Sequence, residues 1–151
     1  MATPSLFRAT DREALLARLR ALRPDSSRQW GKMQPAQMLA HCQVALRVAL
    51  GDQKLKRGLI GILFGGLAKK KLLAEKPWDR NMPTAPEFKV AGSGDLEKER
   101  AALLALVKRF GEGGPAAVTK EPHPFFGALT LEQWDMLQWK HLDHHLRQFG
   151  V

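Results

Sequence analysis

Two histidines near the C-terminus have the spacing of a helical metal-binding pair. His141 and His145 stand four residues apart in the segment KHLDHHLRQFG, so on an α-helix their imidazole rings project from one face, one turn apart. Two rings placed in this way can reach a single metal ion, and neutral imidazole is the commonest protein ligand for zinc and its first-row neighbours. A second interpretation is that basic residues simply favour helix C-termini, where they interact well with the helix dipole.

The hydrophobic pattern around this pair favours the metal. At about 100° per residue, Trp134 and Leu137 fall on the same side of the helix as the two histidines, and His144 falls at the edge of that side. Both imidazoles therefore lie within the apolar face. A buried imidazole needs a hydrogen-bond partner or a metal ion, because an unsatisfied buried polar group costs roughly a few kcal/mol. The metal becomes the better explanation if a third ligand exists elsewhere in the chain.

His41 is a candidate for the third ligand. We expect a helix from about Pro35 to Leu50, ended by Gly51, and His41 lies at the centre of its apolar face. A lone histidine in that position is more often a core residue. Three imidazoles around an open fourth position, however, are the pattern of a catalytic or exchangeable metal site. The neighbouring Cys42 is rotated by about 100° on the helix, and we interpret it as a small hydrophobic residue rather than a thiolate ligand.

The length of the chain indicates one domain, a helical bundle covering residues 1–151. A single cysteine excludes an internal disulfide framework and fits a reducing cytoplasm. No segment has the pattern of a signal peptide, and the longest apolar stretch, residues 58–68, is too short to span a bilayer. The net charge of +9 permits contact with nucleic acid or anionic membranes, but many basic proteins bind neither. Strand-like alternation is absent, which argues against a sheet protein.

The other helices of the bundle follow from capping signals and apolar spacing. A first helix is expected over 11–22, with Thr10 and Glu13 forming a capping box and arginines on its outer face. A third bundle helix is expected over 95–110, ended by Gly111, and Thr130 caps the last helix. Prolines forbid a continuous helix in the long connection 76–94.

Two further segments carry candidate functional residues. The basic, glycine-interrupted segment 53–75 could lie on anionic lipid, but a lid packed over the open end of the bundle is the favoured interpretation. His123, between two prolines in EPHPFFGALT, could line the mouth of the site, although a loop histidine is more often part of the polar surface. Trp139 and Met136, on the back of the last helix, are expected to be exposed and could mark a homodimer contact.

These motifs together resemble those of a known superfamily. The pattern His141-x-x-His144-His145-x-x-Gln148, with His41 in PAQMLAHC, is similar to the DinB/YfiT-like superfamily of metal-binding four-helix bundles, over nearly the whole chain. The segments RNMPTAP, HPFFGALT and KHLDHHLRQFG further resemble an uncharacterised bacterial branch of it, a domain of unknown function. The resemblance implies an all-α, up-down four-helix bundle with a long crossover and an extra helical segment between helices 2 and 3.

The resemblance also implies a metal site and a class of chemistry. His41, His141 and His145 would bind a divalent ion, zinc or nickel first and iron as a further candidate, with water in the open position. His144 and Gln148 would orient the ligands. Some relatives are thiol-dependent transferases or isomerases in which the metal activates a low-molecular-weight thiol, whereas others have no known activity.

Three functions of different classes stay open. The first is a metal-dependent thiol transferase or small hydrolase. Peptidase chemistry is disfavoured, because Leu142 stands where a H-E-x-x-H motif has its glutamate. The second is a metal- or small-ligand-binding module without turnover. The third and least favoured is a nucleic-acid or membrane-surface partner that uses the basic segment. We expect a small-molecule ligand, no nucleic acid and no transmembrane segment.

Overall fold

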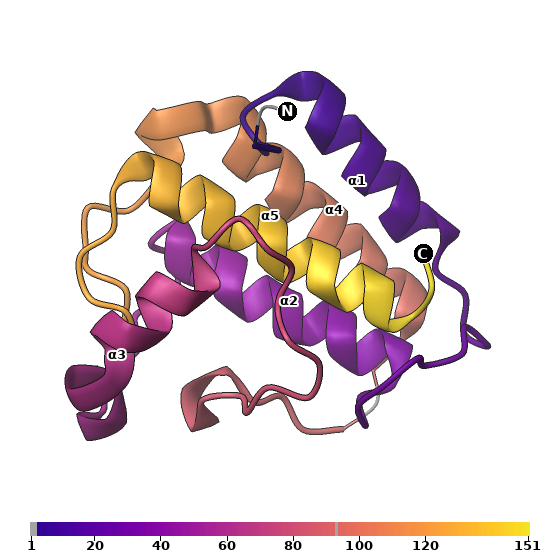
Figure 1. Cartoon of the computed structure of the whole chain (residues 1–151). Helices are drawn as coiled ribbons and strands as arrows, with labels where there is room; N and C mark the ends of the chain where they lie inside the picture. Colours follow the sequence, from indigo (N-terminus) through magenta and orange to yellow (C-terminus); the bar gives the residue numbers. More distant parts are fainter. Residues whose placement is uncertain (1–2, 93) are drawn as a thin grey trace.

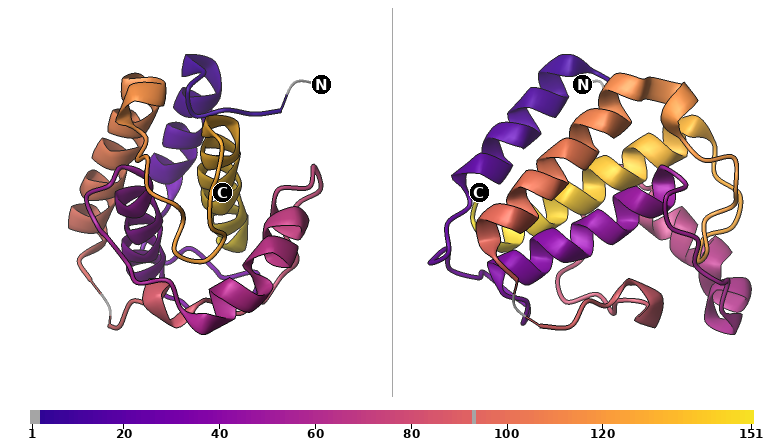
Figure 2. Two further views of the ribbon diagram at one scale, coloured as in Figure 1. Left: turned by 90° about the vertical axis from the view of Figure 1, so that its left-hand side faces the viewer. Right: turned by 180° about the vertical axis from the view of Figure 1, so that it is seen from behind.

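Four helices form a bundle in the computed structural model, which describes residues 3–92 and 94–151. They are α1 (Ala9–Ala21), α2 (Pro35–Ala49), α4 (Leu96–Gly113) and α5 (Leu131–Gln148). Helix α2 packs against α4 and α5, and α1 packs against the same two helices from the opposite side (Figures 1 and 2). The described residues contain no strand. The prediction of an all-α helical bundle is therefore confirmed.

A long crossover joins the two halves of the bundle. After α2 the chain forms α3 (Leu59–Leu72), which protrudes from one end, and then returns below the bundle through the short 3-10 helix η1 (Pro86–Phe88). A second 3-10 helix, η2 (Gly114–Ala117), follows α4. Because of this crossover, α2 and α4 run in the same direction, and α5 runs antiparallel to both (Figure 1). Helix α5 packs against α2.

The core lies between these four helices. It is built from leucines of α1 and α2, from Val107 and Phe110 of α4, and from Trp134 and Leu142 of α5. Cys42 is fully buried within it, and burial raises the pKa of its thiol above the usual range. This agrees with its interpretation as a small hydrophobic residue. Among the described residues, no helix is long and apolar enough to cross a membrane.

The ends of α2 and α5 follow their sequence signals, whereas the start of α1 does not. Thr130 and Gln133 form the predicted capping box of α5. The predicted capping box at Thr10 is wrong, because α1 begins at Ala9 and has no side-chain cap. The side chain of Asp11 instead accepts hydrogen bonds from the Ser5 amide and from Arg8. These bonds fix the incoming chain, so Thr10 lies within the first turn.

Helix α4 runs past its predicted end. We expected Gly111 to end the helix, but α4 continues to Gly113, and Gly114 takes the positive φ of 57°. Gly111 is instead a point of close contact, since a Cβ there would overlap the Leu6 carbonyl and the Arg12 side chain. Arg12 is itself buried and donates to the Leu6 carbonyl at 2.8 Å. The expectation that all arginines of α1 lie on its outer face is therefore wrong at this position.

Candidate metal centre

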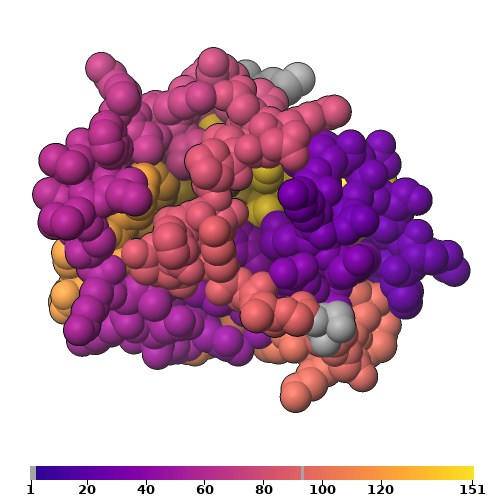
Figure 3. All heavy atoms as spheres, turned by 90° about the horizontal axis from the view of Figure 1, so that it is seen from below, coloured from indigo at the N-terminus to yellow at the C-terminus, as the bar shows by residue number. Residues whose placement is uncertain are grey.

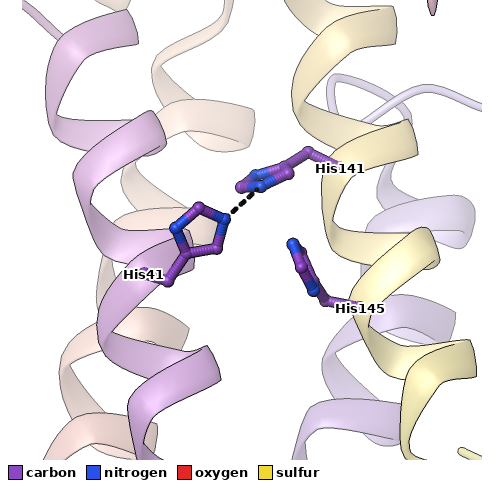
Figure 4. A group of neighbouring side chains, drawn as sticks. All are labelled: His41, His141 and His145. Carbon is purple, nitrogen blue, oxygen red and sulfur yellow. Dashed lines mark hydrogen bonds between the residues drawn. The ribbon is translucent and has the colours of Figure 1, made fainter. Parts of the chain in front are cut away.

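Three histidines from two antiparallel helices meet inside the bundle. His41 lies in the middle of α2, and His141 and His145 lie one turn apart on the facing side of α5 (Figure 4). One ring nitrogen from each residue lies within 4.8 Å of the other two. The three rings come together because each histidine lies on the apolar face of its helix, and these faces of α2 and α5 pack against each other. The structure thus brings together the three residues predicted as ligands.

A backbone carbonyl fixes the tautomer of His41. Its Nδ1 lies 2.8 Å from the carbonyl oxygen of Phe88, in η1 of the crossover. Because a carbonyl can only accept, Nδ1 carries the proton and Nε2 keeps its lone pair. That lone pair faces His141, as the dashed contact in Figure 4 shows. This is how proteins commonly orient metal-ligating histidines.

A chain of two hydrogen bonds fixes the tautomer of His145 in the same way. The Gln148 amide donates from Nε2 to the Trp30 carbonyl at 3.0 Å. Its Oε1 is thereby turned toward His145, whose Nδ1 lies 2.8 Å away and donates to it. The Nε2 of His145 is therefore left with a lone pair. Gln148 holds the position of an orienting group for this ring.

His141 completes the group. Its Nε2 lies 2.9 Å from the Nε2 of His41, while its Nδ1 is buried and has no hydrogen-bond partner in the part of the chain that the structure describes. Since His41 offers a lone pair at Nε2, the contact holds either a proton from His141 or a shared cation. A tetrahedral ion about 2.0–2.1 Å from each nitrogen needs nitrogens about 3.3 Å apart. The nitrogens of His41 and His141, 2.9 Å apart, are thus about 0.4 Å closer than such an ion would need.

The surroundings keep these imidazoles neutral. Burial lowers the pKa of His41 and lowers the pKa of His145 to about 3. Burial also lowers the pKa of His141 well below its ordinary value, and the neighbouring histidines lower it further. The neutral imidazole is the form that binds metal ions. The group is therefore ready to bind a cation at neutral pH without first releasing protons.

A cavity of about 500 Å³ adjoins the three histidines. Its walls come from α3, from the crossover and from the loop before α5. Seen from below, the crossover runs across this face, and α5 is visible in yellow through the gaps beside it (Figure 3). Most of the wall is apolar, and its large side chains include Leu59, Ile60, Met82, Phe88, Phe125 and Phe126. Helix α3 thus forms one wall of the cavity, and its role as a lid stays a prediction.

His123 belongs to the cavity wall and not to the polar surface. It is 5% exposed, and its ring stacks on Phe88 with centroids 5.6 Å apart. Its Nδ1 accepts hydrogen bonds from the amides of Phe125 and Phe126, at 3.0 and 3.1 Å. The proton of the neutral ring must therefore lie on Nε2. Burial lowers the pKa of His123 to about 3, so Nε2 is a fixed hydrogen-bond donor at neutral pH.

His144 and Gln138 line the same cavity with different roles. His144 is partly exposed, and its ring centroid lies 5.5 Å from that of Trp30 and 5.7 Å from that of Trp78. It is not one of the three residues whose nitrogens converge.

Gln138 was not predicted from the sequence. Its Oε1 is buried without a partner among the described residues, and its position about one turn before His141 is the signal that could have revealed it.

The back of α5 differs from what was expected. Met136 and Trp139 are only partly exposed, and Trp139 packs against the core. Both line a separate groove together with Trp30 and Trp78. The expectation that they form an exposed surface is wrong, because the N-terminal segment and the crossover cover this side of the helix.

The fold and the site together define a class of protein: a helical bundle with a three-histidine group that is able to hold a metal ion. The chain matches the model of the family described as "Protein of unknown function (DUF1569)" over residues 1–150, and it belongs to that family. No curated protein and no solved structure matches it.

Proposed function

We propose that the protein binds one divalent metal ion through His41, His141 and His145, and that it is a DinB/YfiT-like metal-dependent enzyme, a thiol transferase or small hydrolase. The observation that carries the proposal is the convergence of three ring nitrogens beside an apolar cavity. Phe88 and Gln148 support it, because their hydrogen bonds leave two of these nitrogens with free lone pairs. Zinc and nickel are the first candidates, with iron next.

The donor set suits catalysis better than purely structural binding. Three imidazoles leave one coordination position of the metal ion open. A metal ion that they hold would lower the pKa of a water or thiol bound at that position toward neutrality. The chain's own residues supply recognition around that position. His123 would donate a hydrogen bond from Nε2 to a ligand, because its Nδ1 accepts from the backbone, and Gln138 would accept one at its unpartnered Oε1. The apolar walls exclude water and select a small, mainly apolar ligand or electrophile.

Elemental analysis of the purified protein tests the metal site. The wild-type chain should carry one equivalent of metal after incubation with zinc or nickel, and His41→Ala and His145→Ala should carry little. His144→Ala is the matched control, because it removes the neighbouring imidazole that lies outside the group, and it should keep the metal. Stoichiometric metal in both His41→Ala and His145→Ala would contradict the proposal.

Catalysis is tested separately on the metal-loaded protein. Consumption of a low-molecular-weight thiol in the presence of electrophilic substrates should be measurable and should stop when a chelator removes the ion. His123→Phe should keep the metal and raise the thiol concentration needed for half-maximal rate. Consistent inactivity across thiols, electrophiles and small esters would favour the alternative function, a metal- or small-ligand-binding module without turnover.

A further inference from the structure

Helix α3 presents an unusually apolar surface to solvent. Six large side chains of this 14-residue helix are each 55–77% exposed: Leu59, Ile60, Ile62, Leu63, Phe64 and Leu67. Only Gly61 and Gly65 of the helix are buried. A soluble surface rarely leaves so many large aliphatic side chains uncovered on one element, and such patches mark interaction sites.

The packing of α3 explains why these side chains face outward. A Cβ on Gly61 or Gly65 would meet the backbone of Phe125, so the two glycines bring the helix backbone directly onto the loop before α5. The contact is therefore made by the glycine side of the helix and not by its leucines. Figures 1 and 2 show α3 projecting from the end of the bundle. The apolar side chains of α3 therefore face solvent and do not belong to the core.

Positive charge flanks the apolar helix at both ends. Residues 54–76 contain seven basic side chains and one acidic side chain, out of a net charge of +9 for the whole chain. Lys54, Lys56 and Arg57 precede the helix and are exposed, and Lys70 and Lys71 at its end are also exposed. Lys71 pairs with Asp79 at 2.7 Å. Most of the excess charge of the protein is thus concentrated around its most exposed apolar element.

We propose that α3 docks this protein on the surface of a bilayer that contains anionic phospholipid. The leucines, isoleucines and Phe64 would enter the headgroup and acyl boundary, and the flanking lysines and Arg57 would contact the lipid phosphates. Burial of exposed apolar side chains, combined with electrostatic attraction between basic residues and anionic lipid, is what drives binding to the membrane interface. It does not require a bound metal ion.

The charge distribution favours lipid over other occupants. Nucleic acid would use the lysines but would leave the six large apolar side chains in water. A second copy of the chain could cover those side chains, but it would bring two clusters of the same charge close together. An anionic bilayer complements both features at once. Leu59 and Ile60 also line the cavity, so docking would place the cavity opening beside the lipid.

Vesicle co-sedimentation of the full chain tests the proposal. At physiological salt, the protein should sediment with vesicles of phosphatidylcholine mixed with phosphatidylglycerol, and at least about tenfold less with phosphatidylcholine alone, since each basic residue near an anionic surface contributes severalfold. The double substitution Leu63→Gln/Leu67→Gln should weaken binding by about tenfold or more, because two large apolar side chains no longer enter the interface. Leu131→Gln, at a 40% exposed site on α5, is the matched control and should bind as the wild type does.

A charge pair and the oligomeric state complete the test. Lys56→Glu/Lys70→Glu should weaken sedimentation severalfold more than Lys98→Glu/Lys108→Glu, which changes the net charge equally on α4. Equal effects of the two pairs, or unchanged binding of Leu63→Gln/Leu67→Gln, would overturn the proposal. So would a wild-type dimer that the leucine substitutions dissociate and that does not sediment with vesicles, since α3 would then be covered by a second copy. Sedimentation velocity distinguishes that outcome.

Discussion

At the scale of single residues, the partner of each Nδ1 decides what the histidine group can bind. The Phe88 carbonyl and the Gln148 amide hold the protons of His41 and His145 away from the shared point. The ring of His41 is thereby oriented by a group 47 residues away in the crossover, and the ring of His145 by a group one turn away on α5. Gln148 was predicted from the motif, whereas Phe88 was not, because a backbone carbonyl in a loop leaves no mark in the residue types.

Loss of the Gln148 amide should weaken metal binding without removing it. In Gln148→Met the Nδ1 of His145 loses its acceptor, so the ring is free to turn or to change tautomer. Removal of such orienting partners typically reduces metal affinity by about 10–100-fold. Competition with a chromophoric chelator measures the change. Gln53→Met, at a partly exposed site away from the cavity, is the control, and an equal loss in both variants would contradict the orienting role.

The buried histidines should make the metal-free protein sensitive to acid. Burial lowers the pKa of His145 from 6.5 to about 3, so between these pH values the unfolded chain binds a proton that the folded chain excludes. The free energy of unfolding should therefore be greatest above pH 6.5 and should fall as the pH drops through this window. The slope is about 1.4 kcal/mol per pH unit for each such proton. Denaturant titrations at several pH values should show a shallower slope for His145→Gln, and an unchanged slope would count against the assignment.

At the scale of helices, regular periodicity was enough to predict the elements, and contacts between elements decided the rest. The apolar spacing of α2 and α5 predicted which faces meet, and hence the histidine group. The start of α1 and the end of α4 could not be predicted in this way. They depend on Asp11, which binds the incoming chain, and on Gly111, whose packing partners lie in α1 and in the segment just before it. The burial of His123 was not predicted for the same reason. Its ring is held by the amides of Phe125 and Phe126, and the conformation of the loop that brings these amides to the ring has no local sequence signal.

Two glycine substitutions should have opposite effects on stability. Gly111→Ala would place a Cβ against the Leu6 carbonyl and the Arg12 side chain, and such overpacking typically costs about 1–3 kcal/mol. Gly66→Ala in α3 meets nothing within 4 Å, and alanine in a helix interior is more favourable than glycine by roughly 0.5–1 kcal/mol. Urea denaturation measures both. Equal and small effects would show that Gly111 is not a tight contact.

At the scale of the whole molecule, the site joins parts of the chain that are far apart in sequence. His41 belongs to the second helix and its orienting carbonyl to the crossover, while His141 and His145 belong to the last helix. A metal ion bound to all three imidazoles would therefore tie α2 to α5 and hold the crossover against them. Binding to the folded state alone must raise the stability of the entire bundle, because the unfolded chain does not assemble the group.

Thermal unfolding in the presence of metal should report this coupling. At a free metal concentration about 100 times the dissociation constant, the folded state gains about 2.7 kcal/mol, and the midpoint temperature should rise by several degrees for a chain of this size. A chelator should reverse the rise. His41→Leu should unfold at the same temperature with and without metal, because the ligand from α2 is gone. His144→Leu should still unfold at a higher temperature when metal is present. If metal still raised the midpoint temperature of His41→Leu, the ion would bind elsewhere on the chain, because the proposed site needs the His41 ligand from α2.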